Sequence, residues 1–350
     1  MNDKKQKLKQ LSQKLKSYGA KHFCVQGALH IKNNLPCQDS AQSCLEENFC
    51  LAVIADGHGS AQYFRSDRGS RIAVEAFENC VKEALTNSKY YYHDSTHPKD
   101  NTAINLIDAL SSSRISIKKR NHAIQWFCQS ILANWLIAVR QDMQNEPFTK
   151  EEIRKIPEKY RTLHEKDHSE YTSAYGSTLI AALLVADFCL LIQIGDGVCI
   201  VFDDAEPDAS SKIKPVHKYA HGNLVSFEPI PVDDKCFLNT TTSLCDAKAR
   251  EEFRSCYLKK LPVAVFVSSD GIEDCFHERA DLHKFFHRIL FDFSDSHEAQ
   301  AQAELQAFLP RLSEKGSGDD MSLSMLYDVS KFKELTADVR DKQLPEAVSN

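Results

Sequence analysis

Short, almost wholly apolar runs recur along the chain and predict strands. The clearest lies at 48–55, where Phe49–Ala55 is uninterrupted by polar residues, which is typical of a strand buried on both faces. The same reasoning predicts strands over 22–31, 177–186, 188–194, 198–203, 263–268 and 321–327. The apolar stretch 178–202 is interrupted by Asp187 and Asp196, so it predicts separate strands rather than a membrane span.

Apolar residues at helical spacing predict helices in the middle and late parts of the chain. The expected helices cover 68–86, 101–143, 278–292 and 297–313. The segment 146–170 is mostly charged and indicates a surface helix or an insert. Because strands and helices do not alternate regularly, the pattern favours an α+β fold with antiparallel sheets over a parallel doubly wound sheet.

The two ends of the chain differ from this body. Residues 1–20 are rich in Lys and carry apolar residues at helical spacing, which predicts a short basic amphipathic helix. Residues 329–350 are charged and poor in large apolar groups, which indicates a loose tail. We therefore expect one body over 21–328, with an extended helical insert at about 80–170.

Composition and charge narrow the class of protein. Of the 350 residues, 42% are hydrophobic and 26% are charged, which is typical of a globular protein and excludes wholesale disorder. The net charge of −6 gives no support for nucleic-acid binding. The 12 cysteines are scattered without a C-x-x-C pair, so we expect reduced thiols in a cytoplasmic protein, not a zinc site or a disulfide framework.

Four predicted buried strands place an Asp beside a Gly at a strand end. Asp56, Asp196 and Asp270 each follow a strand and precede a glycine, and Asp319 follows Gly318 before the last strand. Carboxylates at the edge of an apolar core are costly unless they are paired or bind a cation, and no Lys or Arg accompanies them. Asp-Gly is also ordinary turn chemistry. Four such ends nevertheless favour a shared Mg²⁺ or Mn²⁺ site, since both ions prefer oxygen ligands.

The motifs resemble the metal-dependent protein phosphatase type 2C family, and its bacterial branch in particular. The matching blocks follow the family's order: Gly27–His30, Pro36–Ser40, Ala55–Gly59, Tyr175–Thr178, Ile194–Gly197, Ser268–Asp274 and Gly318–Ser322. The resemblance implies two antiparallel sheets packed as a sandwich and flanked by helices on both sides, in four layers. It also implies a binuclear metal centre at one edge of the sandwich.

The resemblance assigns five residues to this metal centre. Asp56 matches the Asp that bridges both metal ions, and Gly57 matches the residue that offers its carbonyl oxygen. Asp270 and Asp319 match two further ligands of the first metal. Asp196 matches the Asp that holds a third, weaker metal together with the Asp270 equivalent.

Further residues match the surroundings of the metals. Asp39 lies where the family has an Asp behind the ligands, and Asp274 matches an acidic position nearby. Gln38 stands where the family usually has Glu, so a neutral oxygen replaces a carboxylate and the second metal should bind more weakly. His58 matches a proposed general acid for the leaving oxygen.

One departure concerns the phosphate-binding arginine of the family. Asn34 stands at its usual position, five residues before Asp39, and leaves the phosphate without that partner. His30 or Lys32 could take over the role, and we expect His30 to bind the phosphate. In the family, the stretch corresponding to 204–262 carries a flap beside the active site.

The function implied by the resemblance is that of a Mg²⁺/Mn²⁺-dependent serine/threonine phosphoprotein phosphatase. A hydroxide shared by two metal ions would attack the phosphorus directly and in line, without a phospho-enzyme. The expected partners are a phosphorylated protein and, as a further candidate, a cognate kinase, with no nucleic acid and no membrane span. Two alternatives stay open: a non-catalytic module that binds a phosphorylated partner or a kinase, and a hydrolase of a small phosphorylated metabolite.

Overall fold

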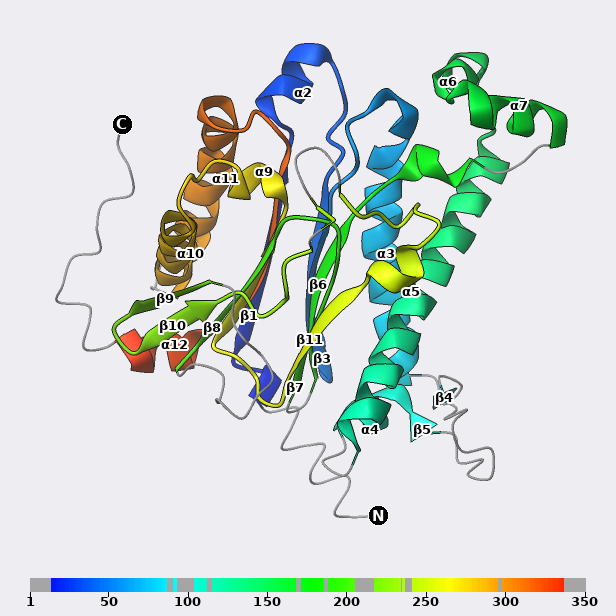
Figure 1. The fold of residues 1–350 in the computed structure, drawn as a ribbon. Coiled ribbons are helices and arrows are strands. Elements are labelled where there is room, and N and C mark those ends of the chain that lie inside the picture. Colours follow the sequence, from blue (N-terminus) through cyan, green and yellow to red (C-terminus); the bar gives the residue numbers. More distant parts are fainter. Residues whose placement is uncertain are drawn as a thin grey trace.

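Two antiparallel sheets that face each other form the centre of the protein (Figure 1). The computed structural model describes residues 14–86, 91–92, 104–111, 115–167, 171–185, 188–204, 217–233, 235–236, 241–294 and 298–336. Sheet A has the strand order β1 (Tyr18–Val25), β13 (Met321–Asp328), β12 (Ala264–Ser268), β8 (Val198–Asp203), β10 (Leu224–Phe227) and β9 (Lys218–His221). Sheet B has the order β11 (Arg254–Leu258), β7 (Phe188–Ile194), β6 (Leu179–Val185), β3 (Phe49–Ala55) and β2 (Ser40–Leu45).

Helices cover the outer face of each sheet (Figure 1). Sheet B carries α3 (Ser66–Thr86), α4 (Leu106–Ser111), α5 (Ile117–Asn145) and, beyond their ends, α6 (Lys150–Lys155) and α7 (Glu158–Asp167). Sheet A carries α10 (Arg279–Ser294), α11 (Glu298–Lys315) and α12 (Val329–Thr336). Short elements complete the described chain: α2 (Ala28–Asn33), η1 (Ala61–Tyr63), η2 (Thr172–Tyr175), α8 (Ala249–Glu252), α9 (Asp270–Glu273) and the pair β4 (Tyr91–Tyr92) and β5 (Ile104–Asn105).

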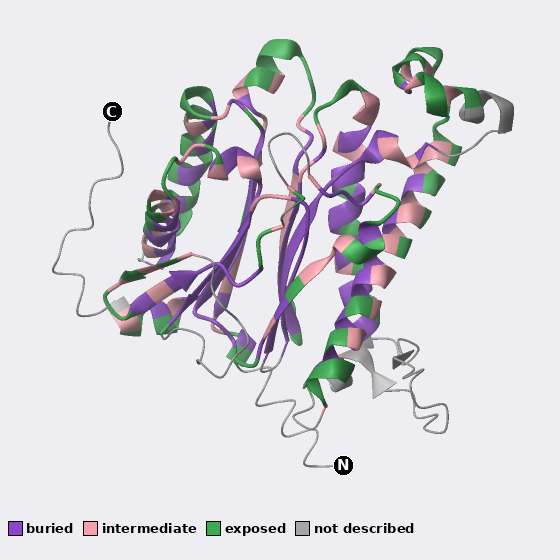
Figure 2. Cartoon of the chain, in the orientation of Figure 1, coloured by how far each residue is buried: buried purple, intermediate pink, exposed green. Residues whose placement is uncertain are grey.

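The core consists of three apolar layers, visible as the buried residues between the elements in Figure 2. Alternate residues of β3 show why its sequence is continuously apolar. Leu51 and Val53 pack against the helices on sheet B, whereas Ala52 and Ile54 pack into the layer between the sheets. Such two-sided burial stabilises each large side chain by about 1.5–3 kcal/mol, so the central strands define the fold.

The strand pairing brings several distant chain segments to one edge of the sandwich. In sheet A, Ser268 at the end of β12 pairs with Leu323 near the start of β13 and with Val198 at the start of β8. In sheet B, Ala55 at the end of β3 pairs with Ser40 at the start of β2. Because neighbouring antiparallel strands run in opposite directions, the end of one strand lies beside the start of the next. The acidic motifs predicted at strand ends therefore meet at this edge.

The α+β class and the four-layer sandwich are confirmed by the structure. The predicted strands at 48–55, 177–186, 188–194, 198–203, 263–268 and 321–327 and the helices at 68–86, 278–292 and 297–313 are present with shifts of a few residues. The expected helix over 101–143 is divided into α4 and α5, and the charged segment 146–170 contains α6 and α7. Among the described residues, no helix combines the length and apolar character needed to cross a bilayer.

The prediction of a strand over 22–31 was wrong in its second half. The strand β1 ends at Val25, and residues from Ala28 onward form α2. Leu29 and Ile31, whose apolar character suggested a strand, are 50% and 58% exposed. The backbone is turned at this point by contacts from far along the chain, since the Ala28 N–H donates to the Ser313 hydroxyl. The polar edge strand β2 was not predicted, because its sequence lacks the apolar alternation that marks a strand.

Both predicted ends also need correction. Residues 18–20 were expected in the N-terminal helix, but they begin β1, where Tyr18 pairs with Asp328. The loose tail was expected from 329, but 329–336 form α12, because the Phe332 side chain is buried against the helices on sheet A. The remaining parts of the two predictions, 1–13 and 337–350, lie outside the described residues.

Candidate metal centre

Asp56 and Asp270 lie together where the two sheets meet. Asp56 directly follows β3, and its backbone is held by two hydrogen bonds with Thr178: the Asp56 N–H donates to Oγ1 (3.0 Å), and the Thr178 N–H donates to the Asp56 carbonyl (2.8 Å). Asp270 starts α9, just after β12, and its carboxyl group lies close enough to that of Asp56 for its charge to raise the pKa of Asp56. The two sheets thus each contribute one carboxyl group to a single point.

Three more acidic residues surround this pair. Burial raises the pKa of Asp56 most strongly, and the charges of Asp39, Asp270 and Asp319 raise it further. Burial likewise raises the pKa of Asp270, and Asp196 and Asp319 add to the effect. Both pKa shifts arise because a carboxylate has lost contact with water and lies near other negative charges. Ionising these carboxyl groups therefore costs free energy unless a cation is bound.

Asp196 and Asp274 both lie close enough to Asp270 to raise its pKa. Burial raises the pKa of Asp274, with Asp196 as the next cause. Asp196 lies in the turn between β7 and β8, flanked by Gly195 and Gly197 with φ values of +97° and +83°, a conformation that favours glycine. The turn is secured from the loop after β10, since the Asp196 N–H donates to the Thr241 hydroxyl (3.0 Å).

Three buried oxygen atoms at this edge have no hydrogen-bond partner: Oε1 of Gln38, Oδ2 of Asp39 and Oδ1 of Asp270. Buried polar atoms are nearly always satisfied, so these three acceptors are free to bind a further partner such as a divalent cation or a water molecule. Together with the converging carboxylates, they fit a divalent cation with oxygen ligands. Asp56, Asp270 and Asp319, which the sequence motifs indicated as ligands of one metal, are not found in the described part of the chain as a group whose ligand atoms all lie within 4.8 Å of one another.

Gln38 occupies the position where a carboxylate was expected. Its Nε2 donates to the Ser66 hydroxyl (2.6 Å), which fixes the amide so that Oε1 is the free atom. Gly57 lies against the same segment, because its N–H donates to the Gln38 carbonyl (3.1 Å). A side chain at position 57 would overlap the carbonyl oxygens of Gln38 and Ser66, so only glycine allows this close approach.

Asp320 is the residue that sequence reasoning missed. It is 3% exposed and accepts hydrogen bonds from the N–H groups of Gly27 (2.6 Å) and Gln38 (2.6 Å) and from Nδ1 of His30 (2.9 Å). Burial alone would raise the pKa of Asp320, but these hydrogen bonds lower it below its usual range. The only signal in the sequence was its place beside Asp319 in Gly318–Asp320, where one carboxylate seemed sufficient.

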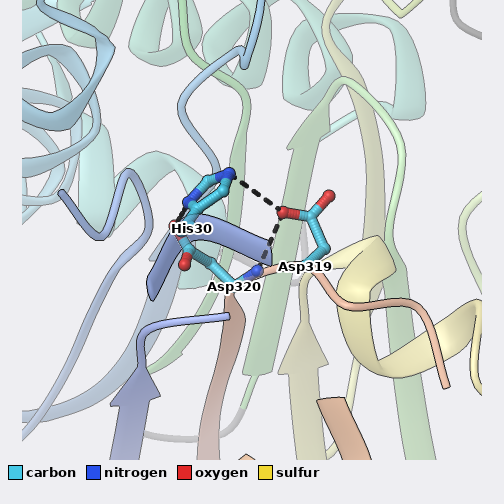
Figure 3. Close-up of side chains that lie close together, drawn as sticks. All are labelled: His30, Asp319 and Asp320. Atoms are coloured by element: carbon cyan, nitrogen blue, oxygen red, sulfur yellow. Dashed lines mark hydrogen bonds and ion pairs between the residues drawn. The ribbon is translucent and has the colours of Figure 1, made fainter. Parts of the chain in front are cut away.

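His30 lies beside Asp319 and Asp320 (Figure 3). Its Nε2 is 3.7 Å from Oδ1 of Asp319, and its other ring nitrogen is bound by Asp320. The hydrogen bond with Asp320 raises the pKa of His30. Ligand atoms of His30, Asp319 and Asp320 lie within 4.8 Å of one another, the one such group of His, Cys, Asp or Glu found in the described part of the chain.

His58 follows Asp56 by two residues. Its ring packs edge-on against Tyr63, with centroids 4.7 Å apart, and its backbone N–H donates to the Gly176 carbonyl (3.1 Å). Burial lowers the pKa of His58 to about 4, so the ring is neutral at pH 7. The side chain can therefore offer a neutral N–H to a leaving oxygen, but it holds no second proton in reserve at that pH.

A cavity of about 160 Å³ adjoins Asp196, lined by the β7–β8 turn and by residues that follow β10. Its charged lining includes Arg254 and Arg279, and both are held by protein groups. Arg254 donates to the Pro231 carbonyl (2.7 Å), and Arg279 pairs with Glu273 (2.5 Å). The cavity opens beside the carboxylate cluster on the side where the flap segment 204–262 was expected.

Comparison with known proteins places this geometry in a family. The family model for protein phosphatase 2C matches residues 26–310, which span all but the last of the motif blocks. Among curated protein sequences, none matches this chain.

Several solved structures are similar to this chain at low identity. PppA of Pseudomonas aeruginosa, described as a key regulatory component of T6SS, is 14% identical, with 89% of this chain and 97% of that chain covered and a TM-score of 0.46. The Mycobacterium tuberculosis serine/threonine phosphatase PstP/Ppp is 11% identical, with 89% and 98% covered and a TM-score of 0.44. The catalytic domain of the phosphatase PstP in complex with two manganese ions is 12% identical, with 89% and 97% covered and a TM-score of 0.41. On the evidence of the family model, the chain belongs to the protein phosphatase 2C family.

Proposed function

We propose that this protein is a Mg²⁺- or Mn²⁺-dependent phosphatase of phosphoserine and phosphothreonine in proteins. The observation that carries the proposal is the meeting of carboxylates from separate segments beside three buried oxygens that lack a hydrogen-bond partner. Such a site is costly without a cation, and membership of the family supplies the reaction class.

The roles proposed for the acidic residues rest on their match to the motifs of the family. Asp56, Asp270 and Asp319 would hold the catalytic cations, with Gly57 offering its carbonyl oxygen and Asp196 a third, weaker site. When bound, two divalent cations lower the pKa of water and neutralise the oxygens of a phosphoryl group. Asp39 and Asp274 lie close enough to orient these ligands and to add negative charge.

His30 and His58 would act on different parts of the substrate. Nε2 of His30 faces the rim beside Asp319, where a phosphoryl oxygen would approach the cations. The neutral His58 ring would donate a hydrogen bond to the serine or threonine oxygen as it leaves. The side chains of His30 and His58 are already positioned by contacts within the protein when no substrate is bound.

The test is manganese-dependent hydrolysis of a phosphothreonine peptide and of p-nitrophenyl phosphate. We expect activity that Mn²⁺ restores after chelation and that Asp56→Asn abolishes. The matched control is Asp281→Asn on α10, because the Asp281 side chain forms a surface ion pair with Lys284. This variant should keep full activity. Full activity in excess chelator would contradict the proposal.

The neutral side chain of Gln38 favours one second candidate, a non-catalytic module that binds a phosphorylated partner. An amide oxygen attracts a divalent cation less than a carboxylate does. If this candidate holds, the protein will bind Mn²⁺ weakly and show no turnover, and a phosphopeptide will bind equally well to Asp319→Asn.

A further inference from the structure

One buried carboxylate joins three segments at the rim of the metal centre. Asp320 precedes β13, and it accepts hydrogen bonds from the turn after β1 at Gly27, from α2 at His30 and from the segment before β2 at Gln38. It is 3% exposed, and three donors occupy its two oxygens. Asp320 is thus satisfied by the protein itself and has little capacity left for a cation.

The bonding of Asp320 determines how the His30 ring is presented. A carboxylate that receives backbone N–H groups on both oxygens is an acceptor, so Nδ1 of His30 is the donor in their 2.9 Å bond. The other nitrogen, Nε2, then points away from Asp320 toward Asp319, whose Oδ1 is 3.7 Å distant (Figure 3). The side chain of Asp319 is 53% exposed, whereas that of His30 is 13% exposed, so Nε2 faces the open rim.

We propose that Asp320 is a positioning residue that holds His30 with Nε2 toward the phosphoryl group of the substrate. The inference rests on the proposed phosphatase function and adds the residue that makes His30 effective. An unanchored histidine on a short helix such as α2 would lose rotamer entropy each time it bound phosphate. The bond with Asp320 removes that cost in advance, which is the general advantage of a pre-organised side chain.

Two substitutions of His30 separate the anchor from the phosphate contact. The amide nitrogen of Asn lies near the position of Nδ1, so His30→Asn keeps the bond to Asp320 and removes the donor at Nε2. The amide nitrogen of Gln lies near Nε2, so His30→Gln keeps a donor toward the rim without the ring's anchor. The probe is inorganic phosphate, titrated calorimetrically into the manganese-loaded protein.

We expect His30→Asn to weaken phosphate binding about tenfold or more, the effect of losing one hydrogen bond to a charged group. His30→Gln should fall between this variant and the wild-type protein. The affinity for Mn²⁺ should change less than twofold in both variants. A comparable loss of Mn²⁺ affinity would overturn the proposal, because His30 would then be a metal ligand.

The role of Asp320 is tested by a double-mutant cycle. Asp320→Asn alone should raise KM for a phosphopeptide and weaken phosphate binding while the melting curve stays cooperative. In the His30→Asn background, Asp320→Asn should add less than a twofold loss of phosphate affinity, because its partner's contact is already gone. Independent losses that multiply would overturn the proposal, since Asp320 would then act only through the fold.

The control for the cycle is Ser313→Ala, which removes a hydroxyl that accepts from the Ala28 N–H of α2 and donates to the Asp319 carbonyl but touches neither ring nitrogen. It should leave phosphate affinity within twofold of the wild-type value, and an equal loss would overturn the proposal, because general support of α2 and Asp319 would then explain the effect. Wild-type turnover decides the proposed function separately: a protein that binds phosphate through His30 yet hydrolyses nothing would sustain this inference and refute the other.

Discussion

The carboxyl groups of Asp56 and Asp270 lie close together at the edge of the two sheets, and the charge of Asp270 raises the pKa of Asp56. Two buried carboxylates at short range repel each other when both are ionised. The pair is therefore an arrangement that the metal-free protein tolerates at a cost, and that cost gives the first of four predictions.

Asp270→Asn should stabilise the metal-free protein while removing its response to metal. The amide removes one negative charge from a cluster in which burial and Asp196 raise the pKa of Asp270. We expect the free energy of unfolding in chelator to rise by about 1–2 kcal/mol. Mn²⁺, which should raise the melting temperature of the wild-type protein by binding the native state, should no longer do so. Thermal melts with and without Mn²⁺ decide the matter, and a variant that melts earlier in chelator contradicts the argument.

His58→Ala should affect phosphopeptides more than p-nitrophenyl phosphate. A serine or threonine oxygen needs a hydrogen-bond donor as it leaves, whereas p-nitrophenolate is a stable anion. We propose the ring of His58, whose pKa burial lowers to about 4, as this donor. We expect kcat to fall about 10²-fold on a phosphothreonine peptide and much less on p-nitrophenyl phosphate. Equal losses on the two substrates would show that His58 only supports the loop.

His287 should make the fold sensitive to acid. The ring is buried among Phe202 of β8, Tyr219 and His221 of β9, and Ser226 of β10, with His283 on its own helix. Burial, then the charges of His221 and His283, lower the pKa of His287 to about 3. The unfolded chain binds this proton near pH 6.5 and the folded chain does not, so stability falls as the pH drops from 6.5 toward 3.

The expected loss from this group between pH 7 and pH 5 is about 2 kcal/mol. His287→Gln keeps a donor for the Ser226 hydroxyl and cannot titrate, so its stability should depend less steeply on pH over this range. Urea unfolding at several pH values gives the comparison. Parallel pH profiles for the two proteins would assign the acid sensitivity to other groups.

Gly27→Ala should displace the segment that carries Asp319 and thereby weaken metal binding, although Gly27 itself is not a proposed ligand. A methyl group at this position would overlap the backbone of Asp319 and Asp320, so the strand start that carries both carboxylates must shift. We expect destabilisation of about 1–3 kcal/mol and a loss of Mn²⁺ affinity. Gly59→Ala is the matched control, because its added methyl meets only Oε1 of Gln38 at 3.8 Å. The prediction fails if the two variants bind Mn²⁺ equally well.

The positions of the candidate acidic residues relative to the fold could be predicted from the sequence, because each lies at a strand end. The apolar run of β3 ends at Ala55, which predicts the end of the strand, and Asp56 is the next residue. The same holds for Asp196 and Asp270. Burial of a continuous apolar strand is a local property of the sequence, so the places where acidic residues interrupt such strands could be located without tertiary information.

The bond between His30 and Asp320 could not be foreseen in this way. Nothing in the pattern around either residue indicates the other, and Asp320 seemed redundant beside Asp319. The same limit explains α2, where the Ser313 hydroxyl and the Asp320 carboxylate turn the chain after β1. Local hydrophobicity carries no information about a polar contact between residues that are distant in the sequence.

The amino-acid sequence by itself determined the central strands, their covering helices and the chemical type of the site, because apolar periodicity and residue type are local properties. The tertiary structure decided which carboxylates touch, which oxygens lack partners and which way His30 faces. Those properties depend on electrostatics and geometry between segments that only the pairing of the strands brings together.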